Sequence, residues 1–204
     1  MGRVSDARER LMNAAAELTW QAGYNAVTVD AICERAGVKK GSFYHFFDSK
    51  AALAVAALDA WWESHTRPTL DAAFSVTVPP LERLERYLDA VYRTQLEMRK
   101  TKGRVLGCPF FSLGMESGGL EPEVWEASQR IVARKRKYIE AAIRDAKEEG
   151  LVDVDDVGEA AQSVQTLMEG ALARARVQNS PEPMRGLFGP VLRLLGARKE
   201  QARA

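Results

Sequence analysis

Residues 28–47 read TVDAICERAGVKKGSFYHFF. Thr28 is suited to cap the start of a helix, and Gly37 tolerates the positive φ that a sharp turn demands. Apolar side chains at Ile32 and Phe43 are spaced to pack two short helices against each other. The pattern therefore predicts two short helices joined by a tight turn, which is typical of a helix-turn-helix motif.

The side chains left for the exposed side of this motif have the chemistry of DNA recognition. Lysine meets phosphate or the acceptors of guanine, serine and tyrosine hydrogen-bond phosphate, and glycine lets a backbone approach closely. Two of the candidates have a simpler explanation that stays open: His45 as a solvated side chain, and Thr28 as a helix cap alone. The candidate DNA-binding residues are Thr28, Lys39, Lys40, Gly41, Ser42, Tyr44, His45 and Lys50.

Overall charge does not by itself indicate a nucleic-acid binder. The 204 residues include 29 Lys and Arg against 28 Asp and Glu, a formal net charge of +1. Residues 1–50 are just as balanced, with seven basic and six acidic side chains. A DNA-binding surface must therefore depend on positive side chains that gather on one face.

Outside the motif the sequence predicts an all-α protein. Glycine and proline occur mainly between helical patterns, and no series of alternating, β-branched segments predicts a sheet. We expect a helix before the motif that ends at Gly23, and another that begins near Ser49 and runs towards Pro68. Further helical patterns cover 81–100, 109–117, 122–149, 157–179 and 184–199.

The stretch AGVKKGSFYHFFDSKAAL at 36–53, preceded by TVDAI, resembles the N-terminal signature of TetR-type transcriptional regulators. The resemblance covers roughly the first quarter of the chain, and the chain length also suits the family. It implies a helix-turn-helix DNA-binding domain of three helices at residues 1–50. It also implies a larger helical effector-binding and dimerisation domain at residues 51–204, and a homodimer made through the last two long helices.

The function implied by the resemblance is sequence-specific regulation of transcription. Such a protein binds a palindromic double-stranded DNA operator and is released by a small-molecule effector, whose identity the sequence does not indicate. A repressor is the default, and activation stays open. Two residues depart from the family pattern: Lys39 replaces a capping Ser or Thr, and Phe46 replaces a polar aromatic residue. We expect Lys39 to weaken the cap and Phe46 to remove one polar contact.

Large apolar side chains in the C-terminal part are candidates for an effector pocket between helices. Ordinary core packing is the favoured explanation for any single one of them, because a helical bundle needs such side chains without a ligand. The candidates are Trp61, Tyr92, Phe110, Phe111, Met115, Trp125 and Met168.

Gly107-Cys108-Pro109 resembles a feature of some TetR-type regulators, a few of which sense electrophiles through cysteine. Pro109 fits a first helical position, which places Cys108 at a helix N-terminus where the dipole favours the thiolate. Cys108 is therefore a candidate redox or electrophile sensor. A small, partly buried cap residue is the favoured alternative, because no nearby cation can be placed. The basic run RKRK at 134–137 is interpreted as a solvated face of a long helix.

Other function classes find little support in the sequence. The two histidines, His45 and His65, form no recognisable nucleophile arrangement with Cys108, and no phosphate-binding glycine pattern occurs. We therefore expect no catalytic residues, no cofactor, no metal site and no enzyme activity. The absence of a signal sequence and of a long apolar run predicts a cytoplasmic protein without a membrane anchor. A ligand-binding or protein-interaction module with a vestigial DNA domain stays as the alternative.

Overall fold

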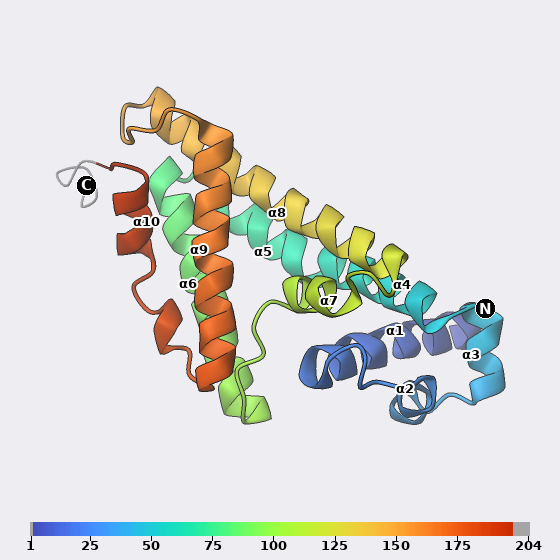
Figure 1. Cartoon of the computed structure of the whole chain (residues 1–204). Coiled ribbons are helices and arrows are strands. Elements are labelled where there is room, and N and C mark those ends of the chain that lie inside the picture. The colour runs from blue at the N-terminus through green and yellow to red at the C-terminus, as the bar shows by residue number, and fades with distance from the viewer. Residues whose placement is uncertain (1, 198–204) are drawn as a thin grey trace. The chain divides into compact units, whose positions relative to one another are not determined.

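The computed structural model describes residues 2–197, with side chains from residue 6 onward. Every regular element in this range is a helix, so the predicted all-α class is confirmed (Figure 1). None of the helices described is both long and apolar enough to cross a membrane. The chain forms two compact units, Met1–Thr66 with Pro109–Val132, and Arg67–Cys108 with Ala133–Ala204.

The first unit contains the predicted motif. Its helices are α1 (Gly2–Ala22), α2 (Val29–Ala36), α3 (Lys40–Phe46), α4 (Lys50–Trp61), α7 (Pro109–Ser117) and the first part of α8 (Pro122–Glu148). Leu11 of α1, Phe43 of α3 and Leu53 of α4 are fully buried in one core cluster with Ile32 and Phe47. Each such side chain contributes about 1.5–3 kcal/mol through burial. This core fixes α3 against α1, α2 and α4.

The second unit contains α5 (Arg67–Ala73), α6 (Pro80–Lys102), the rest of α8, α9 (Val157–Gln178) and α10 (Phe188–Leu194). Helix α10 lies beside α9 and also contacts α6 (Figure 1). Ile139 and Ile143 of α8 and Met168 of α9 are fully buried, together with Val191 of α10. Apolar faces at helical spacing therefore supply the core of this unit.

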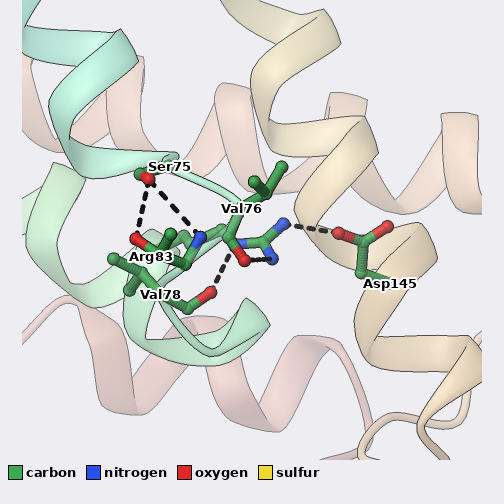
Figure 2. Close-up of polar contacts among 6 residues, drawn as sticks. Ser75, Val76, Val78, Arg83 and Asp145 are labelled. Carbon is green, nitrogen blue, oxygen red and sulfur yellow. Dashed lines mark hydrogen bonds and ion pairs between the residues drawn. The ribbon is translucent and has the colours of Figure 1, made fainter.

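A buried arginine holds the segment that connects α5 to α6. The Arg83 guanidinium donates to the carbonyl oxygens of Val78, at 2.7 Å, and Val76, at 3.4 Å. It also pairs with Asp145 of α8 (Figure 2). Buried charges are tolerated when they are paired and hydrogen-bonded, and Arg83 meets both conditions.

One predicted helix end is wrong because the chain passes a proline without stopping. The helix does not end at Pro68 but widens into a π-helical turn at Trp62–Thr66 and continues as α5. Proline lacks an N–H and its ring clashes with the carbonyl four residues earlier, here that of Ser64. The wider turn accommodates both effects.

The helix expected over 184–199 is also wrong. It is replaced by a 3₁₀ turn at Glu182–Met184 and the seven-residue α10, while residues 198 and 199 lie outside the described part of the chain. Gly186, between the two pieces, has a φ of +67°, which breaks a helical path and favours glycine. The two long helices that precede the C-terminus are therefore α8 and α9, and α10 is short.

Candidate functional site

The turn between α2 and α3 has the predicted geometry. The Thr28 hydroxyl accepts the N–H of Ala31 at 3.1 Å and so caps α2. Gly37 adopts the left-handed conformation at φ +63°. The N–H groups of Gly37 and Val38 then donate to the carbonyls of Glu34 and Cys33, at 3.1 and 2.9 Å. These bonds end α2 and turn the chain into α3, as helix-turn-helix motifs require.

Helix α3 divides its side chains between the core and the surface. Phe43 is fully buried, whereas the neighbouring Tyr44 is 56% exposed. A shallow hollow beside α1 and α3 brings together four of the predicted DNA-binding residues, Lys39, Gly41, Ser42 and His45. Lys39 precedes the helix without a side-chain cap hydrogen bond in the described structure, as its departure from the capping pattern predicted.

Lys40 makes an ion pair that the sequence did not reveal. Its Nζ lies 2.8 Å from Oδ1 of Asp30, in the first turn of α2. The hydrogen bond and the negative charge of Asp30 raise the pKa of Lys40. Both side chains are exposed, so a DNA phosphate can compete with Asp30 for the ammonium group.

The structure gives Lys50 a role within the protein. Its Nζ donates to the carbonyl oxygens of Tyr24 and Val27, each at 3.1 Å, and lies 4.0 Å from the centre of the Tyr24 ring. Two charge-assisted hydrogen bonds and a cation–π contact thus brace the connection between α1 and α2. A contact of Lys50 with the DNA backbone stays a prediction.

The predicted effector residues do not form one site. Phe110, Phe111, Met115 and Trp125 line a groove of about 390 Å³ between α7 and the first part of α8. Trp61 and Phe110 line a cavity of about 30 Å³ that holds no more than about one water molecule. The remaining two, Tyr92 and Met168, belong to the second unit.

Three side chains of the second unit form a buried polar cluster. The Lys135 Nζ lies 3.0 Å from Glu169 Oε1 and 3.5 Å from Cys108 Sγ. Burial lowers the pKa of Lys135, but the negative charge that Cys108, Tyr87 and Glu169 can carry raises it well above its usual range. The cation that could not be placed beside Cys108 from the sequence is therefore Lys135.

The interpretation of residues 134–137 as a solvated face is wrong for Lys135, which is only 4% exposed. Lys135 follows Ile131 and precedes Ile139 at intervals of four, so it lies on the buried face of α8. The helical period of the apolar residues was the signal that could have identified it.

The loop that leads to Cys108 is held by two amide side chains. Oε1 of the buried Gln95 accepts the N–H groups of Leu106, at 3.2 Å, and Gly107, at 2.9 Å. Asn179, after α9, accepts the N–H of Val105 at 2.9 Å. These bonds fix the backbone beside the thiol. In the described range no group of three His, Cys, Asp or Glu side chains is arranged to hold a metal ion.

Two family models match this chain. Residues 11–57 match the model for bacterial regulatory proteins of the tetR family, and residues 80–188 match the tetracyclin repressor-like C-terminal domain. The first match contains the helix-turn-helix motif, and the second covers more than half of the chain.

Individual proteins agree with the family models. The transcriptional regulator AcuR of Cereibacter sphaeroides is 31% identical over 183 residues, which are 89% of this chain and 81% of AcuR. The transcriptional repressor NemR of Escherichia coli K12 is 25% identical over 193 residues, 93% of this chain and 94% of NemR. The crystal structure of the regulatory protein TetR from Rhodobacter sphaeroides matches with a TM-score of 0.77 at 30% identity, covering 93% of this chain and 97% of that one. The chain therefore belongs to the TetR family and is a DNA-binding transcriptional regulator rather than an enzyme.

Proposed function

We propose that this regulator is a repressor that binds a palindromic operator as a homodimer and leaves it when a small-molecule effector binds. Residues 1–50 serve as the DNA-binding domain, and residues 51–204 bind the effector and form the dimer. The DNA-binding part of this proposal is supported by helix α3, in which Phe43 is buried and Tyr44 is exposed. A recognition helix needs such an anchor on one side and free side chains on the other.

Each exposed residue of the motif has a role in this proposal. Lys40 and Ser42, in the first turn of α3, reach base edges, and Gly41 allows the backbone to approach the DNA closely. Phosphate contacts position the helix and come from four residues that carry no sequence information themselves. These residues are Thr28, Lys39, Tyr44 and His45, with Lys50 as a further contact or as a brace.

The proposed dimer uses the elements found in the last two predicted helical ranges, 157–179 and 184–199, which are α9 and the short α10. Val177 of α9 is 87% exposed and Leu194 of α10 is 40% exposed, although both are large and apolar. Such side chains are stabilised when a second copy covers them. A two-fold dimer presents its two recognition helices to half-sites related by the same symmetry, which explains a palindromic operator.

Selection from random-sequence duplex DNA by the purified full chain tests the proposal. The expected result is enrichment of one sequence with two-fold symmetric half-sites whose centres lie about one helical turn or a multiple of it apart. Binding to that duplex should weaken steeply as salt rises. If no sequence is enriched over the starting pool, the alternative of a vestigial DNA domain is favoured.

The effector is proposed to bind in the groove between α7 and α8, because four predicted pocket residues line it. The ligand must bind one conformation of the dimer better than the other, since equal affinity for both shifts nothing. A thermal-stability screen of the purified protein, followed by operator titration with each stabilising compound, identifies such a ligand. Compounds that stabilise the protein without weakening operator binding contradict the effector role of the groove.

A second candidate function, thiol sensing by Cys108, is favoured by the ammonium group of Lys135 at 3.5 Å. A nearby cation favours the thiolate, which is the nucleophilic form. Cys33 offers an internal control, because both thiols are buried and burial raises the pKa of the Cys33 thiol. With iodoacetamide, the Cys108 sulfur displaces iodide and forms a thioether, and we expect faster labelling of Cys108 than of Cys33. An unchanged operator response to electrophiles in Cys108→Ser removes the sensing role.

A further inference from the structure

The groove between α7 and α8 is lined mostly by apolar residues, with Ser128 and Gln129 as its polar members. Nine residues line it: Phe110, Phe111, Gly114, Met115, Gly118, Trp125, Ser128, Gln129 and Val132. None of these nine carries a charge. Met115 and Trp125 are 62% and 42% exposed, so large apolar surfaces remain in contact with solvent. Exposed apolar surface that lines a groove indicates a binding site more than a packing need.

Two glycines line the groove on the α7 side. A Cβ atom at Gly114 would lie 3.2 Å from Cβ of Ser128, which is tighter than ordinary contact. A Cβ atom at Gly118 would lie 3.8 Å from Cδ1 of Trp125. Gly114 lies inside a nine-residue helix, where glycine is unfavourable compared with alanine. The glycine therefore lets α7 approach Ser128 of α8 closely, at a cost to the helix.

Ser128 supplies an unused hydrogen-bonding group at the floor of this groove. Its residue is 2% exposed, and its Oγ has no hydrogen-bond partner within the described structure. A serine inside a helix usually bonds the carbonyl four residues earlier, which would be that of Val124. A hydroxyl both donates and accepts, so a buried one without a partner costs free energy until another molecule supplies the bond.

We propose that this groove binds a flat, uncharged, largely aromatic small molecule whose single polar group hydrogen-bonds to Ser128 Oγ. The volume of about 390 Å³ lies within the range of about 300–1,000 Å³ typical of small-molecule sites. Aromatic and thioether walls pack on flat rings, and the lack of charged groups disfavours an ionic ligand. The inference rests on the proposed function only in identifying this molecule as the effector.

Three matched compounds test the ligand class: 2-naphthol, 2-naphthoate and naphthalene. In calorimetric titrations of the full chain, 2-naphthol should bind about tenfold more tightly than naphthalene, because its hydroxyl can form one hydrogen bond with Ser128. The 2-naphthoate anion should bind more weakly than 2-naphthol, because no cation lines the groove. Absence of binding by 2-naphthol at millimolar concentration, or tighter binding of the anion, overturns the proposal.

Variants locate the binding in the groove. Ser128→Ala should remove the difference between 2-naphthol and naphthalene while leaving the naphthalene affinity unchanged. Gly114→Ala should weaken both compounds, because its methyl group would press against Ser128 at the floor of the groove. Ser112→Ala is the matched control, since it removes a hydroxyl of α7 that does not line the groove. An unchanged ratio in Ser128→Ala overturns the inference.

Operator titrations with 2-naphthol separate this inference from the proposed function. Ser128-dependent binding without any loss of operator affinity supports the ligand class and contradicts the effector role. Operator release by 2-naphthol that persists in both Ser128→Ala and Gly114→Ala supports an effector role and overturns this site. The two failures are thus distinguishable by measuring ligand binding and operator binding on the same variants.

Discussion

Lys135 Nζ lies 3.0 Å from Glu169 Oε1, and the two side chains are 6% and 5% exposed. Each charge needs the other at this depth, because either one alone would be buried without a compensating partner. The pair joins α8 to α9 within the second unit. Lys135 also donates a hydrogen bond to Cys108 of the same unit.

Removing one member of this pair should destabilise the protein strongly. We expect Lys135→Met to lower the free energy of unfolding by about 3–5 kcal/mol, because the Glu169 carboxylate stays buried and unpaired. The double variant Lys135→Met, Glu169→Leu should lose far less than the sum of the single variants. Urea unfolding of the four proteins measures this coupling, and additive losses would show that the pair is not coupled.

Alkaline stability should depend on Tyr87. Burial raises the pKa of Tyr87 to about 12, whereas the phenol titrates near 10 in an unfolded chain. The folded state therefore holds this proton more tightly, and the associated stability is complete below pH 10 and lost as pH rises from about 10 to 12. A shift of this size corresponds to roughly 2–3 kcal/mol.

The measurement is urea unfolding at several alkaline pH values. Tyr87→Phe should lose less stability than the original protein between pH 10 and pH 12, because it has no proton to release there. Tyr44→Phe is the matched control, since Tyr44 is 56% exposed. Parallel curves of stability against pH for the original protein and Tyr87→Phe would contradict the role of Tyr87 in alkaline stability.

Local features of the sequence were sufficient to predict the helix-turn-helix motif. A capping Thr28, a left-handed Gly37 and a buried Phe43 act within one or two turns of the chain, so their spacing alone predicts the geometry. The broken C-terminal helix was missed because its apolar period continues across Gly186, although the backbone turns there. Periodicity measures which side chains are buried and does not measure where a helix stops.

Partners that are distant in sequence could not be predicted in the same way. Lys40 with Asp30, Lys50 with the carbonyls of Tyr24 and Val27, and Lys135 with Glu169 are pairings that only the fold creates. A lysine has the same pattern in a sequence whether its ammonium group binds phosphate, a carbonyl or a carboxylate. Sequence reasoning therefore identified the scaffold of the DNA interface better than its individual contacts.

Lys50 and Lys39 should respond differently to substitution. Lys50→Met should lower the free energy of unfolding by about 2 kcal/mol, because it removes two charge-assisted hydrogen bonds and a cation–π interaction. Lys39→Met should change stability by less than about 0.5 kcal/mol, since the side chain is exposed. Lys39→Met should instead weaken operator binding and reduce the salt slope by about 0.9 for each phosphate that the protein no longer neutralises.

Urea unfolding and operator titrations at several salt concentrations distinguish the two lysines. Weaker operator binding by Lys50→Met is attributed to DNA contact only if the variant is still fully folded at the temperature of the assay. An unchanged salt slope in Lys39→Met would contradict a phosphate contact by Lys39.

Substitution of Gly41 should have opposite effects on the stability of the fold and on DNA binding. Among the described atoms, a Cβ at this position would meet nothing within 4 Å, so the free protein does not need a glycine there. Gly41→Ala should stabilise the fold by about 0.5–1 kcal/mol through helix propensity, yet weaken operator binding, because the added methyl group blocks close approach of the backbone. Thr94→Ala in α6 is the control, since it also favours a helix at an exposed position away from the motif. If Gly41→Ala is more stable and binds the operator as well as Thr94→Ala does, the head of α3 does not approach the DNA in the way proposed.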